Sequence, residues 1–244
     1  MPLSRSRPTD PALVELIARP FAHRGLHGGG RIENSRAAFE AAIAQGQGIE
    51  LDVQASRDGH AVVFHDYDLE RLTTASGKVA HRTLAELRQV RLRGTVETIP
   101  DLPEILALIG GRASLLIEVK APRRVVSPLC RSVRRALEGY TGPVAVMSFN
   151  PEVGYWFSVH APHVLRGLVA TEREKRGAKG DLQRRLALWR SRPHFLAYDI
   201  RDLPSRFAAG ARRPVLTWTV RTADDRARAG RHADQIIHEL PVLS

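Results

Sequence analysis

The stretch "IELDVQASRDGHAVVFHD", residues 49–66, decides how the chain folds and where its chemistry lies. Side chains two apart in a strand share a face, so Glu50 and Asp52 project from the same side of an otherwise apolar strand. An Asp-Gly pair at 58–59 predicts a tight turn, and the chain then returns as a short strand that ends at His65. An apolar strand does not hold an unpaired carboxylate without a large penalty, so this hairpin indicates a functional site.

Short apolar runs recur along the rest of the chain and alternate with segments of helical character. Such alternation predicts a parallel sheet, and eight units predict an α/β fold closed into a (β/α)8 TIM barrel. A length of 244 residues suits one domain over residues 1–244. The predicted strands are 20–24, 48–53, 114–119, 143–148, 164–168, 195–198, 214–220 and 234–238. The predicted helices are 35–45, 101–109, 124–138, 151–158, 181–191, 203–209 and 222–229.

Two segments depart from this alternation. Residues 66–97 follow the hairpin and are expected to form a small irregular insertion after the second barrel strand. The charged, glycine-containing segment 172–180 is expected to be an exposed loop.

The composition favours anionic partners. The chain has 37 Lys and Arg residues against 26 Asp and Glu residues, a formal net charge of +11, which favours phosphates, nucleic acid or an acidic membrane surface. The single cysteine, Cys130, excludes an internal disulfide and fits a reducing compartment. The first apolar run is short and interrupted by Glu15, and no stretch approaches the roughly 18 apolar residues of a membrane span. We therefore expect a soluble, cytoplasmic protein.

Polar residues cluster near the ends of the first three predicted barrel strands, where barrel enzymes place their chemistry. Three converging carboxylates repel one another unless a cation lies among them, and all-oxygen ligation suits Mg²⁺ or Ca²⁺. Two histidines offer an acid and a base near neutral pH, and two cationic side chains offer an anion clamp. These parts together predict a phosphoester-cleaving site. The carboxylates are Glu50, Asp52 and Glu118, the histidines are His23 and His65, and the cations are Arg24 and Lys120.

The motifs around these residues are FAHRG, IENS, IELDV, VVFHD and LLIEVK, followed by VMSFNP, VLTWTV and ADQIIHELP. In this order and spacing they resemble the glycerophosphodiester phosphodiesterase family, over residues 20–241. The resemblance implies a (β/α)8 barrel with a small insertion after strand two. It also implies hydrolysis of glycerophosphodiesters to glycerol 3-phosphate and an alcohol, with a divalent cation as cofactor.

The resemblance assigns roles to individual residues. By analogy, His23 and His65 would be the catalytic acid/base pair, Glu50, Asp52 and Glu118 would ligate Mg²⁺ or Ca²⁺, and Arg24, Lys120 and Trp218 would bind the substrate, with Trp218 at its glycerol end. Glu33 and Asn34 would shape the site near strand one, with Glu33 close to the metal as one option.

Several of these residues also have plainer interpretations. Asn34 or Ser35 can simply cap the helix that follows, and Trp218 can be ordinary core. The glycines at 28–30 lack the neighbours that define a phosphate-binding P-loop, and we interpret them as a loop near the site. The other histidines, His27 among them, are expected at the surface or in structural roles.

Three arginines, Arg124, Arg131 and Arg135, share one face of a predicted helix. A solvated outer face is the first interpretation of this pattern, and peripheral contact with an anionic membrane is the alternative. No nucleic-acid module is recognisable, so the expected partner is a small-molecule substrate, with the oligomeric state left open.

Two positions depart from the family's usual pattern. Arg221 stands where the family often has Asn, and His238-Glu239 stand where a Thr-Asp pair is common. Both bear on the choice of substrate. The alternative activity is that of a lysophospholipase D-like or cyclic-phosphate-forming phosphodiesterase on a lipid substrate, which the polar insertion at 66–97 disfavours. A non-catalytic binding module is a further alternative, against which the complete set of acids and histidines argues.

Overall fold

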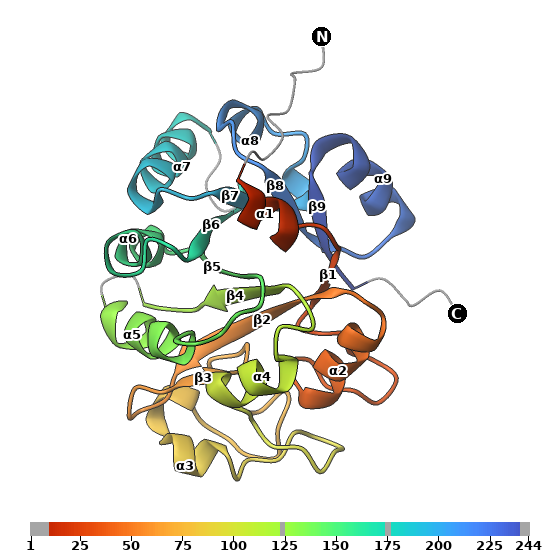
Figure 1. Ribbon diagram of the computed structural model, residues 1–244, viewed down its shortest axis with the longest axis vertical. Coiled ribbons are helices and arrows are strands. Elements are labelled where there is room, and N and C mark those ends of the chain that lie inside the picture. The colour runs from red at the N-terminus through yellow and green to blue at the C-terminus, as the bar shows by residue number, and fades with distance from the viewer. Residues whose placement is uncertain (1–9, 123–124, 174–176, 240–244) are drawn as a thin grey trace.

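The computed structural model describes residues 10–122, 125–173 and 177–239 and shows a closed barrel of parallel strands (Figure 1). Strand β1 pairs in parallel with both β2 and β9, which closes the ring of eight. The barrel strands are β1 (Phe21–His23), β2 (Gly48–Ala55), β4 (Leu115–Val119), β5 (Val144–Ser148), β6 (Leu165–Ala170), β7 (Phe195–Asp199), β8 (Val215–Val220) and β9 (Gln235–His238). The predicted TIM barrel and its strand positions are therefore confirmed.

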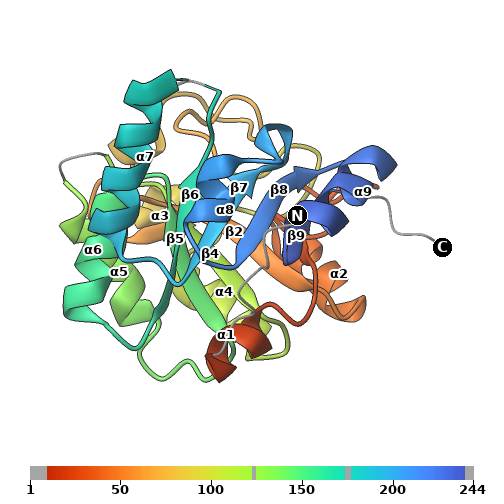
Figure 2. The same cartoon turned by 90° about the horizontal axis from the view of Figure 1, so that it is seen from above.

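Helices connect the strands and cover the outside of the barrel (Figures 1 and 2). They are α2 (Arg36–Ala44), α4 (Leu102–Ile109), α5 (Ser127–Ala136), α6 (Pro151–His160), α7 (Gly177–Ser191), α8 (Arg206–Gly210) and α9 (Ala223–His232). Most begin at a side-chain cap; the Ser35 hydroxyl, for example, accepts a hydrogen bond from the Ala38 N–H at the start of α2. No helix among the described residues is long and apolar enough to cross a membrane.

Three predicted segments differ from the structure. The helix expected at 203–209 begins only at Arg206, because the Ser205 side chain caps it, and a 3-10 turn, η2 (Ile200–Asp202), precedes it. The loop expected at 172–180 is helical from Gly177 onward, and residues 174–176 lie outside the described residues. In the helix expected at 124–138, Arg124 also lies outside the described residues.

The hairpin after β2 forms as predicted. Strand β3 (Ala61–Val63) pairs antiparallel with the end of β2, and Gly59 at the turn has φ 82°, a left-handed conformation that suits glycine. The insertion that follows is more ordered than the sequence analysis expected, with the 3-10 turn η1 (Val79–His81) and helix α3 (Leu84–Leu87). Its few apolar residues, including Leu69, join Val62 and Phe64 in a buried cluster of their own.

An N-terminal helix that the sequence analysis did not predict, α1 (Pro11–Leu16), closes one end of the barrel (Figure 2). Its Leu13 and Leu16 share a buried cluster with Phe21 and Phe195, which begin β1 and β7. The N-terminal ends of the strands are therefore filled with apolar side chains. The acids and histidines singled out from the sequence lie at the opposite, C-terminal end.

Two glycines make room for the large rings in this filled end. A Cβ placed on Gly48 would lie 2.6 Å from the Phe21 ring, and one on Gly167 would lie 2.4 Å from the Phe195 ring. Both distances are shorter than any tolerable carbon–carbon contact. Each glycine thus fixes the place of a neighbouring phenylalanine in the barrel interior.

We expect Gly167→Ala to destabilise the protein by about 1–3 kcal/mol, because the added methyl group overpacks the Phe195 ring in a closed interior. Gly230→Ala is the matched control, since a Cβ at this position in α9 meets nothing within 4 Å. The control is expected to be neutral or slightly stabilising, as alanine favours a helix. Urea unfolding of the two variants tests this; equal stability of both would contradict the packing account.

Candidate functional site

Three carboxylates meet at the C-terminal end of the barrel. Glu50 and Asp52 project inward from β2, and Glu118 projects from β4, where it lies in register with Asp52. Their ligand oxygens all lie within 4.8 Å of one another. Glu50 and Asp52 are each only 1% exposed. The structure thus gathers the three acids that the sequence analysis named as metal ligands.

Asp52 is surrounded by positive charge and hydrogen-bond donors. The Lys120 ammonium lies 3.3 Å from Asp52 Oδ1 and 3.0 Å from Glu118 Oε1. Arg24 Nε lies 3.3 Å from Asp52 Oδ2, and the Asn34 side-chain amide donates to the same oxygen at 3.0 Å. Burial alone would raise the pKa of Asp52, but the charges of Lys120 and Arg24 outweigh it and lower that pKa.

Glu50 is in the opposite electrostatic situation. Its pKa is raised well above the ordinary value, first by burial and then by the negative charges of Asp52 and Glu118. Its hydrogen-bond donor is the backbone N–H of Arg24, at 3.1 Å from Oε2. The three acids together hold more negative charge than the two neighbouring cations neutralise. An all-oxygen set with such a deficit of positive charge fits a hard divalent cation such as Mg²⁺ or Ca²⁺.

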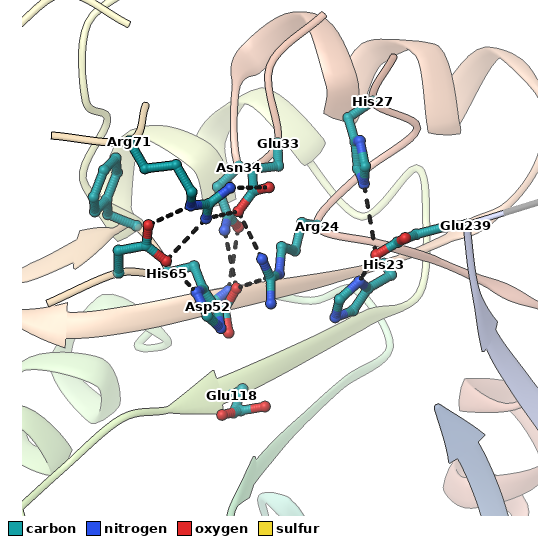
Figure 3. Close-up of polar contacts among 12 residues, drawn as sticks. His23, Arg24, His27, Glu33, Asn34, Asp52, His65, Arg71, Glu118 and Glu239 are labelled. Atoms are coloured by element: carbon teal, nitrogen blue, oxygen red, sulfur yellow. Dashed lines mark hydrogen bonds and ion pairs between the residues drawn. The ribbon is translucent and has the colours of Figure 1, made fainter. Parts of the chain in front are cut away.

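The two predicted histidines each lie against a carboxylate that an arginine also holds. His23 Nδ1 is 2.6 Å from Glu239 Oε1 (Figure 3). The Arg221 guanidinium donates to both oxygens of Glu239. Burial alone would raise the pKa of Glu239, but its hydrogen bonds to His23 and Arg221 reverse the effect and lower it. Glu239 therefore remains ionised at neutral pH.

His65 repeats this arrangement with different elements. His65 Nδ1 is 2.6 Å from Asp66 Oδ1, and Arg71 of the insertion donates to both oxygens of Asp66. The hydrogen bond from Arg71 is the main reason that the pKa of Asp66 falls to about 2.

An ionised carboxylate can only accept a hydrogen bond, so Nδ1 of each histidine must carry the proton. In the neutral ring, Nε2 is then the free acceptor. Both rings line the same cavity, and His23 Nε2 lies 3.9 Å from Glu50 Oε2. The geometry thus fixes the tautomer that leaves a basic nitrogen available at the cavity.

The loop after β1 brings Arg24 and Asn34 together. Both have left-handed backbones, with φ 57° and 56°, and the Asn34 N–H donates to the Arg24 carbonyl at 2.9 Å. Glu33, expected to help shape the site near strand one, accepts hydrogen bonds from Arg24 and Arg71 (Figure 3). Glu33 therefore links the first strand's loop to the insertion.

A cavity of about 280 Å³ lies beside these groups, and its lining includes His23, Arg24, Glu50, His65, Glu118 and Lys120. Trp218 forms part of its wall, where the indole N–H donates to the Ala197 carbonyl at 2.9 Å and the ring meets Phe149 edge-on at 5.5 Å. Arg201 and Arg221 also border the cavity. Trp218 is thus both a neighbour of the barrel core and a cavity residue.

Sequence reasoning missed several members of this site. Asp66 directly follows His65, and Glu239 directly follows the last barrel strand, so there was a reason in the sequence to consider both positions. There was none for Arg71, because the partner Glu33 lies 38 residues away in the chain. His27, expected at the surface or in a structural role, lies with His23 and Glu239 in a group whose ligand atoms are within 4.8 Å.

The chain belongs to the glycerophosphoryl diester phosphodiesterase family, whose model matches residues 23–238. A glycerophosphodiester phosphodiesterase from Bacillus altitudinis is 42% identical over 112 residues, which cover 43% of this chain and 45% of that protein. One from Caldanaerobacter subterraneus subsp. tengcongensis is 35% identical over 147 residues, which cover 56% and 60%. The chain thus spans about half the length of the curated relatives it matches.

Solved structures share the fold. A phosphodiesterase from Oleispira antarctica, in complex with the product sn-glycerol-3-phosphate, superposes with a TM-score of 0.81 at 24% identity, covering 93% of this chain and 95% of that one. The glycerophosphodiester phosphodiesterase from Thermotoga maritima superposes with a TM-score of 0.71 at 23% identity, covering 90% and 93%.

The raised pKa of Glu50 leads to a prediction about stability. In the metal-free protein the folded-state pKa of Glu50 exceeds the ordinary value of 4.5. The free energy of unfolding therefore falls as the pH rises from the ordinary pKa through the folded-state pKa. We expect Glu50→Gln, in EDTA, to be more stable than the wild type at pH 8, with the difference shrinking toward pH 5, where Glu50 is increasingly protonated. Urea unfolding at several pH values measures this.

Glu138→Gln, which changes an exposed acid at the end of α5, is the matched control and should follow the wild type at every pH. A constant difference between Glu50→Gln and the wild type across the pH range would contradict the electrostatic account.

Proposed function

We propose that this protein hydrolyses glycerophosphodiesters to glycerol 3-phosphate and an alcohol. Glu50, Asp52 and Glu118 would hold the divalent cation, Mg²⁺ or Ca²⁺, and His23 and His65 would act as acid and base. The observation that carries the proposal is that both carboxylate-held histidines and the acidic cluster face one small cavity. Family membership and the glycerol 3-phosphate complex of the Oleispira relative support the choice of substrate.

Binding of the phosphate falls to Arg24 and Lys120. Both side chains border the cavity, and the pKa of Lys120 is raised, because the charges of Glu118 and Asp52 outweigh the effect of burial. Lys120 therefore stays charged across the neutral range. The bound cation would neutralise charge that develops on the phosphate. Arg24, held between Glu33 and Asp52, is oriented before the substrate arrives.

The histidines move the protons. Nε2 of one histidine accepts a proton from the attacking hydroxyl. If that hydroxyl belongs to water, glycerol 3-phosphate forms directly. If it belongs to the substrate's own glycerol, the alcohol leaves first and a water molecule must then open the cyclic phosphate to give glycerol 3-phosphate. The other histidine, in its protonated form, gives its Nε2 proton to the oxygen of the leaving alcohol. Each such transfer contributes a rate factor on the order of 10²–10⁴. Glu239 and Asp66 stabilise the protonated rings and keep their orientation.

The cavity favours a small, water-soluble diester over a lipid. Its volume is about 280 Å³, and it is bordered by charged residues of β7 and of the segments that follow β7 and β8: Asp199, Arg201 and Arg221. The apolar lining residues lie among these charged groups, and the volume leaves little room for a long acyl chain; they are Met147, Phe149, Val169, Ile200, Trp218 and Ile237. We propose that the aromatic pair contacts the glycerol half of the substrate.

The direct test is product analysis with glycerophosphocholine, glycerophosphoethanolamine, glycerophosphoglycerol and a lysophospholipid, with Mg²⁺, Ca²⁺ or EDTA. We expect metal-dependent release of glycerol 3-phosphate, reduced at least about 10²-fold in His23→Ala and in His65→Ala. Arg131→Ala, on the outer face of α5, should leave the rate unchanged. Release of lysophosphatidic acid or a cyclic phosphate instead would favour the alternative phosphodiesterase. The absence of any product from a folded, metal-binding protein would contradict the proposal.

Replacing the carboxylates beside the histidines tests whether they hold the rings for proton transfer. Glu239→Gln and Asp66→Asn each put an amide in place of the ionised carboxylate next to Nδ1, so we expect kcat to fall about tenfold or more, with a smaller change in KM. Steady-state kinetics with glycerophosphocholine measures this. An unchanged kcat in both variants would show that the two carboxylates do not hold the histidines for catalysis.

A further inference from the structure

A second, larger cavity lies at the end of the barrel opposite the site. This basal groove, of about 940 Å³, is bordered by α7 and by the segments that lead into β6, β7 and β8. Those segments enter the barrel at the N-terminal ends of the strands. The cavity residues are Arg166, Arg185, Trp189, Arg192, Arg212 and Arg213, together with apolar residues such as Leu13 of α1.

The five arginines of the basal groove outnumber its one lining carboxylate, Asp10. Within the described parts of the chain, no carboxylate lies within ion-pair distance of any of them. By contrast, Arg184 and Arg190 of the same helix pair with Asp181 and Glu152. Arg166 Nε is buried without a hydrogen-bond partner, and burial together with the charge of Arg192 lowers the pKa of Arg166. Such a concentration of like charge in a protein with an overall excess of cations indicates an anionic partner.

The outer face of α7 adds exposed apolar side chains next to these arginines. Leu182, Leu186 and Trp189 are 58%, 55% and 73% exposed. Their spacing of four and three residues places them along one face of the helix, which lies on the outside of the barrel (Figure 1). Tryptophan and leucine beside arginine is the composition of a helix face that lies in a membrane interface.

Other occupants explain only part of this surface. A second copy of the chain would bring five further arginines against the first five. A nucleic acid or an acidic peptide would meet the arginines in the groove. Neither accounts for Leu182 and Leu186, which continue along α7 outside the groove. An anionic bilayer meets both features, since headgroup phosphates attract the arginines and the interface accepts the apolar side chains.

We propose that α7 and the basal groove dock onto an anionic phospholipid membrane. The arginines lie at the headgroup phosphates, and Leu186 and Trp189 enter the interface. The small cavity at the C-terminal ends of the strands then lies at the end of the barrel remote from the groove. Substrate reaches it from water, so docking localises the protein without presenting it with the lipids of the bilayer.

The test is sedimentation of the full chain with vesicles of phosphatidylcholine alone or with about one third phosphatidylglycerol. We expect binding only to the anionic vesicles, weakened by salt, with a blue shift of Trp189 fluorescence. Arg185→Glu/Arg212→Glu should reduce the partition coefficient about tenfold or more, and Leu186→Ala/Trp189→Ala should also reduce it. Arg131→Glu/Arg135→Glu on α5 makes the same change of charge on another face and should bind like the wild type.

If Arg185→Glu/Arg212→Glu and Arg131→Glu/Arg135→Glu lost binding equally, the vesicles would be attracting the protein's net positive charge rather than the basal groove. That result would overturn the proposal. The absence of binding to anionic vesicles would also overturn it. So would binding to RNA or polyglutamate that is tighter than binding to the vesicles and that is lost in Arg185→Glu/Arg212→Glu. The melting temperature of each variant, measured alongside, shows that a loss of binding does not come from unfolding.

Discussion

The need to hold three buried carboxylates together at one end of a barrel governs the arrangement of the site. Glu50, Asp52 and Glu118 lie within 4.8 Å of one another, and Lys120 and Arg24 neutralise only part of their charge. Burial and this remaining imbalance together raise the pKa of Glu50. A proton or a divalent cation would relieve the imbalance. The proposal of a cation therefore has support in the chain's own electrostatics.

The barrel makes this concentration of charge tolerable by separating its two ends. Phe21, Phe195 and the leucines of α1 fill the N-terminal end, and glycines at 48 and 167 leave space for the rings. With that end packed, the C-terminal end can hold polar groups around a cavity. The insertion that interrupts the alternation of strands and helices contributes Asp66 and Arg71. Asp66 contacts the His65 ring and Arg71 holds Asp66, so the insertion orients His65.

Much of this could be predicted from sequence because the signals were local. The alternation of apolar runs with helical segments predicted the barrel. The spacing of two residues in a strand predicted that Glu50 and Asp52 lie on the same face. Contacts between distant segments could not be predicted. The pairing of Glu239 with His23 spans almost the whole chain, and Arg71 has no sequence context that distinguishes it from other arginines. The predicted start of α8 was wrong because the Ser205 cap, rather than the apolar pattern, sets where this helix begins.

The most direct test of the account is calorimetric titration of the metal-free protein with Mg²⁺ and with Ca²⁺, in buffers of different ionisation enthalpy. The account predicts one cation per chain, release of a proton on binding at pH values where Glu50 is protonated in the metal-free protein, and loss of both in Glu50→Gln, while Glu138→Gln binds like the wild type. Undiminished binding by Glu50→Gln, or binding that releases no proton at any pH, would contradict the claim that the three carboxylates form the cation site.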